Sequence, residues 1–361
     1  MGFSCGIVGL PNVGKSTIFN CLTSGNAEVS DYPFCTINPN KGIVRVPDTR
    51  LDKLRTLLDP EELLPETLEF IDIAGLVEGA SLGQGLGNKF LAEIRQVDAI
   101  LHVIRCFGNG EVNAVEDVKV VNTELALSDL ETVERRLESL VKSQKSEAKS
   151  SMEISPDEER ELLLRARDAL GRGIPVRLFE RSEISFPTGF DSLLKGLNLL
   201  TAKPVIYVAN VEDAAKSFKG LEDFAKAEES PLLYISALLE SELQELTGKE
   251  AEEFRREFGL EETALDKLIS TSYSALQLIT FYTVAGGKVS ARILKQGTLA
   301  PEAGGKIHSD MEKGFIKAEV VSFQEFEGCG GMKQAKEKGH LRVEGKDYIV
   351  QDGDVIYFQF R

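Results

Sequence analysis

The sequence predicts a mostly parallel α/β sheet, interrupted by a helical insertion and followed by a small β-rich domain. Through residue 240, short apolar runs end at turns and alternate with helix-compatible segments. We expect strands at residues 3–9, 68–73, 99–104, 205–209 and 232–235. After residue 277 the pattern becomes β-like and rich in Gly, with apolar runs at residues 278–284, 289–294, 348–350 and 355–360.

The insertion is expected at residues 122–200, which are rich in helix formers. A polar stretch at residues 143–156 favours the exposed tip of an antiparallel helical hairpin. The alternative is a pair of helices packed on the sheet with one solvated charged face. The heptad-like spacing lies in the first helix, at Leu125, Leu127, Leu130, Val133, Leu137 and Leu140.

Composition and charge exclude several classes of protein. The 361 residues are 42% hydrophobic, and no run approaches the ~18 apolar residues of a membrane helix. The N-terminus lacks the features of a secretory signal and the five Cys show no CxxC spacing, so we expect a cytoplasmic protein with no membrane partner. The net charge of -16 argues against general nucleic-acid binding, and no DNA partner is expected. Three widely separated His argue against a His-rich metal site or a Ser-His-Asp hydrolase.

A phosphate loop lies between the first expected strand and a helix expected at residues 15–22. Residues 9–16 read GLPNVGKS and match GxxxxGK[ST]. The glycines let backbone N–H groups wrap phosphates, Lys15 reaches the β and γ oxygens, and the Ser16 hydroxyl joins a Mg²⁺ shell. The motif therefore predicts a P-loop NTPase that takes Mg²⁺ with its nucleotide. The residues expected to bind the nucleotide here are Asn12, Val13, Gly14, Lys15, Ser16 and Thr17.

A DxxG motif follows the strand expected at residues 68–73. It places the Asp72 carboxylate near the metal and the Gly75 N–H near the γ-phosphate. The Gly-rich residues 79–87 come directly after it, and we expect them to reorder with nucleotide state as a second switch.

Thr36 is the expected first-switch residue, because it offers one hydroxyl in the irregular loop at residues 32–39. Such a threonine ligates Mg²⁺ only while the γ-phosphate is present; the alternative is an ordinary loop threonine. The expected metal ligands are Ser16, Thr36 and Asp72, and the expected catalytic groups are Lys15, Thr36 and Gly75.

Residues 210–213 bear on the choice of base. Guanine-specific members of this class carry NKxD, in which Asp accepts from two guanine N–H groups and Lys covers the base. Here the segment reads Asn-Val-Glu-Asp, so the lysine is absent and the carboxylate register is open between Glu212 and Asp213. These residues alone leave both ATP and GTP open. The residues expected around the base are Asn210, Val211, Ser236 and Ala237.

Leu76 occupies the position at which Ras-like enzymes place the glutamine that orients the attacking water. An alkyl side chain cannot do this. We expect slow intrinsic hydrolysis, with the water positioned by another residue or by a partner.

These motifs together resemble the YchF/Obg-like ATPase family of translation-factor-class P-loop proteins, over essentially the whole chain. The most specific segments are GIVGLPNVGKST at 6–17, YPFCTINPN at 32–40, DIAGLVEGAS at 72–81, GLGNKFLAEIR at 85–95, EKGFIKAEV at 312–320 and EGKDYIVQDGDV at 344–355.

The resemblance implies a G-domain-like P-loop NTPase with an inserted helical hairpin and a C-terminal β-grasp (TGS) domain. It also implies a preference for ATP and association with the ribosome, including the large subunit and its RNA. The expected division is a nucleotide-binding domain at 1–121 and 201–277, a helical insertion at 122–200 and a TGS domain at 278–361.

Two features depart from the family pattern. Asp213 stands where the family usually has Glu, which bears on the preference for ATP. The segment at 107–122 is shorter than usual and offers Asn113 and Ala114 where many members carry a histidine proposed to assist hydrolysis. Catalysis then uses another group or depends more on a partner.

In the TGS-like segment, five cations are candidates for a face that binds ribosomal RNA, with solvated surface lysines as the alternative: Lys288, Arg292, Lys306, Lys313 and Lys317. Two other functions stay open. One is a GTP-specific GTPase of the same fold, and the other is a non-enzymatic scaffold that nucleotide merely stabilises.

Overall fold

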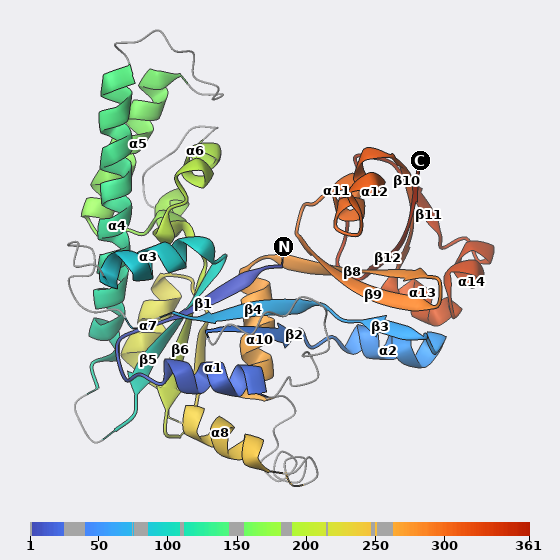
Figure 1. Cartoon of the computed structure of the whole chain (residues 1–361), viewed down its shortest axis with the longest axis horizontal. Helices are drawn as coiled ribbons and strands as arrows, with labels where there is room; N and C mark the ends of the chain where they lie inside the picture. The colour runs from blue at the N-terminus through green and yellow to red at the C-terminus, as the bar shows by residue number, and fades with distance from the viewer. Residues whose placement is uncertain are drawn as a thin grey trace. The chain divides into compact units, whose positions relative to one another are not determined.

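The computed structural model describes residues 2–24, 40–73, 75, 86–108, 112–143, 155–181, 190–213, 216–246, 250 and 263–361 (Figure 1). Contacts between Cα atoms divide the chain into two compact units. The first contains Met1–Ile43 and Glu69–Leu268, and the second contains Val44–Leu68 and Ile269–Arg361. No helix in the described ranges is both long and apolar enough to cross a lipid bilayer.

The first unit is built on a mostly parallel sheet, as the sequence predicts. Its strand order is β2-β4-β1-β5-β6-β7, and the five strands from β4 to β7 run parallel. Edge strand β2 is antiparallel to β4, since Asp72 N donates to Asn40 O and Val46 N donates to Glu66 O, each at 2.9 Å. The strands are β1 (Ser4–Val8), β2 (Lys41–Arg45), β4 (Thr67–Asp72), β5 (Ala99–Cys106), β6 (Val205–Val211) and β7 (Leu232–Ile235).

Helices cover this sheet because their apolar positions recur at helical spacing. Helices α3 (Leu86–Gln96), α4 (Ala114–Ser143) and α7 (Lys219–Ala227) bury apolar side chains in one cluster with β1, β5 and β6. Helix α1 (Lys15–Ser24) packs against α8 (Ala237–Glu245), and α10 (Ala264–Ala275) precedes the C-terminal strands.

Helix α4 runs from the sheet into the helical insertion: its residues up to Leu125 pack in the sheet's cluster, and those from Ala126 onward pack with α5, η3 and α6. Helix α4 starts at Ala114, so residues 114–121 are helical rather than part of a loop. Helix α5 (Pro156–Gly171) lies beside α4 (Figure 1) and starts with a capping box between Ser155 and Glu158. Shorter elements complete the insertion: η3 (Val176–Arg181), α6 (Phe190–Leu197) and η4 (Leu200–Ala202).

The buried carboxylate of Asp129 pins the base of the insertion. It accepts hydrogen bonds from Leu200 N at 2.8 Å and from Thr201 N and Oγ1, each at 2.7 Å. These bonds satisfy the first N–H groups of η4, which would otherwise be buried without partners.

The second unit has its own six-stranded sheet, in the order β11-β10-β12-β8-β9-β3. The run at residues 348–350, expected as a strand, forms only an isolated bridge between Ile349 and Leu299. The strands are β3 (Glu62–Leu64), β8 (Leu278–Ala285), β9 (Lys288–Lys295), β10 (Phe315–Ser322), β11 (Arg342–Glu344) and β12 (Asp354–Phe360). The helices are α2 (Thr49–Leu58), α11 (Ala300–Gly305), α12 (Ser309–Lys313), α13 (Phe323–Cys329) and α14 (Met332–Glu337).

Residues 44–68, which the sequence analysis assigned to the nucleotide-binding domain, belong to this second unit. Strand β3 forms one edge of this sheet and pairs in parallel with β9, from Glu62 opposite Lys288 to Leu64 opposite Ser290. Leu51 and Leu54 of α2 are fully buried in a cluster with residues of β8, β9, β12 and α13. Residues 44–68, called the excursion below, are thus an integral part of the C-terminal fold.

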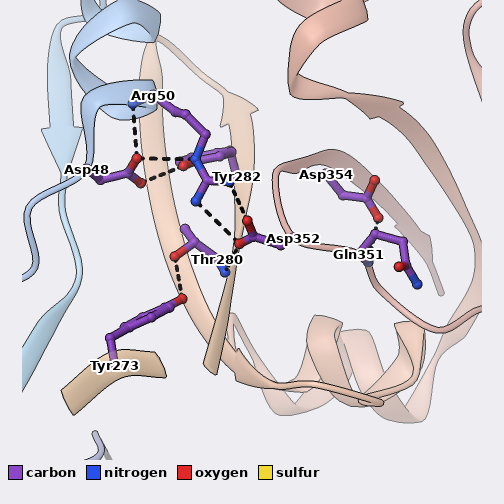
Figure 2. A network of polar contacts seen from close by, with 8 residues as sticks. All are labelled: Asp48, Arg50, Tyr273, Thr280, Tyr282, Gln351, Asp352 and Asp354. Atoms are coloured by element: carbon purple, nitrogen blue, oxygen red, sulfur yellow. Dashed lines mark hydrogen bonds and ion pairs between the residues drawn. The ribbon is translucent and has the colours of Figure 1, made fainter. Parts of the chain in front are cut away.

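A polar network fixes the start of α2 to the C-terminal strands (Figure 2). Asp48 caps the helix by accepting from Arg50 N at 3.0 Å, and its other oxygen accepts from the Tyr282 hydroxyl at 2.5 Å. Arg50 reaches Asp352 at 2.6 Å, and Asp352 also accepts from Thr280 N at 2.9 Å. Burial and the Asp48 carboxylate raise the pKa of Tyr282, so its hydroxyl remains a donor.

His102 is buried in β5 and does not form part of a catalytic pair. Only 1% of its surface is exposed, and its ring centroid lies 5.7 Å from that of Tyr207. Burial, with smaller contributions from the charges of Arg177 and Lys15, lowers the pKa of His102 to about 3. The imidazole is therefore neutral in the folded protein around neutral pH.

This histidine predicts acid sensitivity. As the pH falls below about 6.5, an unfolded chain binds a proton at His102 while the folded protein does not, so the free energy of unfolding decreases by up to about 1.4 kcal/mol per pH unit. The free energy of unfolding of His102→Gln should lack this decrease, because glutamine does not titrate. The variant should therefore become more stable relative to wild type as the pH falls. Urea unfolding of both proteins between about pH 7 and pH 5 measures the difference. A difference that stays constant with pH would contradict the prediction.

Candidate nucleotide site

The phosphate loop lies between β1 and α1, as its motif requires, and its shape depends on glycine. Gly9 has φ +151°, and a Cβ atom there would lie 2.4 Å from the carbonyl oxygen of Val103 on β5. Asn12, also with positive φ (62°), and Thr17 are both exposed, Asn12 in the loop and Thr17 in the first turn of α1. Both are accessible to a bound nucleotide.

Gly14 is the second position where no side chain fits. Its φ is +97°, and a Cβ atom would lie 2.2 Å from the side-chain nitrogen of Asn210. That amide donates to Val13 O at 2.9 Å, and its oxygen accepts from Ala237 N at 3.1 Å. One side chain from the end of β6 therefore ties the phosphate loop to the first residue of α8.

Lys15 lies inside the loop, with 8% of its surface exposed. Its ammonium donates to Leu10 O at 2.9 Å and to Gly9 O at 3.2 Å. Burial lowers the pKa of Lys15, and the charge of Asp72 opposes that shift. A Cβ atom at Gly75 would lie 3.1 Å from the Lys15 ammonium, so the DxxG glycine adjoins the phosphate loop.

The expected metal ligands Ser16 and Asp72 are brought together from α1 and the end of β4. The Ser16 hydroxyl donates to the Asp72 carboxylate at 2.7 Å. Two hard oxygen donors at one point suit Mg²⁺, which typically takes one or two carboxylates and completes its shell with phosphate and water. Within the described residues no cluster of three or more His, Cys, Asp or Glu offers an all-protein metal site, and the donors present fit a nucleotide-bound Mg²⁺.

The residues expected around the base have different surroundings. Val211 is 2% exposed and packs in the core, so only its main chain is available to a ligand. Ser236 is the N-cap of α8, and its hydroxyl accepts from Leu239 N at 3.3 Å. Ala237, 4% exposed, holds the Asn210 amide through its backbone N–H.

Glu212 has a role that the sequence did not reveal. Its carboxylate accepts from Gly108 N at 3.1 Å, which joins the segment after β6 to the segment after β5. No periodicity or motif signals a hydrogen bond between residues 104 positions apart. Counted from Asn210, Asp213 is the residue at the fourth position of NKxD.

Several predicted residues lie outside the described part of the chain: Thr36, Leu76 and the Gly-rich residues 79–85. At the segment in which family members carry a histidine, Ala114 is the first residue of α4 and is 6% exposed. Its methyl side chain is in the core and cannot contribute to hydrolysis.

The geometry at Gly14 gives a sharp prediction. Gly14→Ala should lower nucleotide affinity by about tenfold or more, because the new methyl group displaces the Asn210 amide and is strained at positive φ. Titration with a fluorescent nucleotide measures the loss. Gly171→Ala, on α5 with open space at its Cβ position, is the matched control and should bind as wild type. Equal affinities for the three proteins would contradict the assigned role of Gly14.

Two family models match parts of the sequence. A YchF-GTPase_C family model, described as a protein of unknown function (DUF933), matches residues 278–361. An MMR_HSR1 model, described as a 50S ribosome-binding GTPase, matches residues 4–145.

Similarity to individual proteins extends over the full chain. The sequence is 47% identical over 374 residues to the "Ribosome-binding ATPase YchF" of Bacillus subtilis (strain 168), covering 100% of both chains. It is 45% identical over 378 residues to the protein of that name from Escherichia coli O157:H7, covering 100% of this chain and 99% of that one. The solved structure of the Schizosaccharomyces pombe YchF GTPase matches with a TM-score of 0.86 and 32% identity, covering 99% of this chain and 98% of that chain.

These matches confirm the family and the fold class that the motifs predicted. With such identity along its whole length, the chain belongs to the YchF family.

Proposed function

We propose that the chain is a Mg²⁺-dependent switch protein that binds and hydrolyses ATP and associates with the ribosome. The observation that carries the proposal is the phosphate loop with Lys15 inside it and the Ser16–Asp72 pair at its end. Relatives at 45% and 47% identity are named ribosome-binding ATPases, which supports both parts of the proposal. A ribosomal partner also favours a cytoplasmic location.

Each group at the site has a proposed task. Backbone N–H groups of residues 12–17 surround the phosphates, and Lys15 exchanges its loop carbonyls for β and γ oxygens. Ser16, Asp72 and, in the first switch, Thr36 would hold Mg²⁺, which neutralises charge on those oxygens when bound. Gly75 adjoins Lys15. Its proposed task is to donate its N–H to the γ-phosphate, so that loss of this phosphate changes the conformation of the residues that follow.

Three features bear on the choice of base. Val211 stands where guanine-specific members place the lysine that covers the base, and its buried side chain cannot cover a base. The Glu212 carboxylate already accepts a hydrogen bond from Gly108 N. Asp213 could still accept from guanine, so a GTP-specific enzyme is the alternative. The relatives' name supports ATP.

The three parts of the chain have separate proposed roles. Residues 1–121, apart from 44–68, and residues 201–277 form the nucleotide-binding domain. Residues 122–200 form the helical insertion, and 278–361 a TGS domain that contacts the large ribosomal subunit and its RNA. Residues 44–68, which pack within the C-terminal unit, connect the two proposed switches to that unit through continuous chain.

The first test concerns nucleotide choice. Calorimetric titration of ligand-free protein with Mg-ATP and Mg-GTP should give tighter binding of ATP, by about tenfold or more. Lys15→Ala should bind both weakly, because it removes the charge that contacts the phosphates. Clearly tighter binding of GTP would favour the alternative GTPase.

The second test concerns turnover and separates a switch from a scaffold. The isolated protein should hydrolyse ATP slowly, on the order of 10⁻³ s⁻¹ or less, because Leu76 cannot orient water. Purified large ribosomal subunits should accelerate hydrolysis by wild type but not by Lys15→Ala. Rapid turnover without a partner would contradict the prediction about Leu76. A Lys15→Ala protein that folds and fully replaces wild type in cells would favour the non-enzymatic scaffold.

A further inference from the structure

Ion pairs occupy most of the basic face expected in the C-terminal unit. Three of its five cations contact carboxylates, and two of those carboxylates come from the excursion at residues 44–68. The pairs are Lys288 with Glu62, Arg292 with Glu66 at 3.2 Å, and Lys317 with Glu319 at 3.8 Å. A cation with a fixed carboxylate partner offers little net attraction to phosphate, so this face is a poor RNA-binding surface.

A different segment of the same unit carries uncompensated positive charge. Residues 332–346, which comprise α14, the following turn and edge strand β11, contain five Lys or Arg and two acidic residues, in a chain of net charge -16. In Figure 1, α14 and β11 lie at one end of the C-terminal sheet. All five basic residues are exposed: Lys333, Lys336, Lys338, Arg342 and Lys346.

The acidic side chains of the neighbouring helix α13 already have partners. Glu325 accepts from Ser322 at 2.7 Å and contacts His340 at 3.1 Å, and Glu327 pairs with Lys53 of α2 at 3.3 Å. In the ranges that the structure describes, Lys333, Lys336 and Lys338 form no ion pair. Their charge is therefore available to an external anion.

The fold holds these lysines in a defined arrangement. Ala335 is fully buried and anchors α14, while Lys333 and Lys336 are three residues apart and so adjacent on the outer side of the helix. Arg342 on β11 contacts Asp354 and lies over the Tyr348 ring, 5.6 Å from its centroid. It fixes the edge strand next to the lysines and has less free charge than they do.

We propose that this surface, defined as Lys333, Lys336, Lys338 and Lys346, binds the phosphate backbone of RNA in the large ribosomal subunit. Flexible, strongly hydrated ammonium groups suit phosphate recognition without base readout. A membrane is a poorer fit, because the six-residue α14 turns its buried alanine inward and offers no apolar face for insertion. The proposal rests on the proposed ribosomal function and identifies the surface that performs it.

The test compares two triple variants with the same loss of charge. Lys333→Gln/Lys336→Gln/Lys338→Gln removes three of the four lysines of the surface. Lys216→Gln/Lys219→Gln/Lys226→Gln removes three exposed lysines at and before α7. Co-sedimentation with purified large subunits is measured over a series of KCl concentrations. The surface variant should bind about tenfold or more weakly at low salt, with a log–log salt slope reduced by roughly 2 to 3. The α7 variant should behave as wild type, and both should melt and bind ATP normally.

Three outcomes would overturn the proposal. In the first, the surface variant binds subunits with wild-type affinity and salt slope. In the second, both variants bind subunits equally weakly. In the third, the surface variant loses binding only to phosphatidylserine vesicles or only to subunits stripped of accessible RNA. Absence of any wild-type binding to subunits, with ATP binding intact, would overturn the ribosomal part of the proposed function together with this surface. If wild type binds subunits but does not bind ATP, the proposed nucleotide site is contradicted, and the salt series still tests the lysine surface on its own.

Discussion

The nucleotide site depends on one buried side-chain amide. Asn210 donates to Val13 O and accepts from Ala237 N, and it is 5% exposed. The Asn210 amide pairs with an acceptor in the phosphate loop and a donor at the start of α8. It holds the two segments together, and neither backbone group is left without a partner. The same amide occupies the space next to Gly14, which explains why that position has no side chain.

The rest of the site follows from this tie and from the sheet beneath it. Parallel strands bring their carboxyl ends to one edge, so Asp72 at the end of β4 reaches Ser16 at the start of α1. Lys15 then lies against two carbonyl oxygens of the loop that Asn210 holds. A charge placed in a prearranged polar site spends little energy on reorganisation when phosphate arrives.

The sequence predicted the parts of the molecule that depend on local pattern. The strands at 68–73 and 232–235 and the helix after the phosphate loop appear within one or two residues of their expected bounds, since apolar runs and glycine turns act over short distances. The excursion at 44–68 could not be predicted, because its burial depends on strand β9, more than 200 residues later. The contact of Glu212 with Gly108 and the pairing of Lys288 with Glu62 escaped prediction for the same reason: partners distant in sequence leave no local signature.

The excursion has a consequence for anyone who divides this protein into fragments. A cut that removes residues 278–361 would strip the cover from Leu51 and Leu54 and leave β3 without its neighbour, in a fragment that still contains them. Such a fragment would expose the apolar face of α2 and an unpaired strand edge, both of which promote aggregation. Poor solubility of the shortened protein would then result from residues 44–68, which have lost the strands they pack against. Two separately folding fragments would require Val44–Leu68 to be kept together with the C-terminal residues.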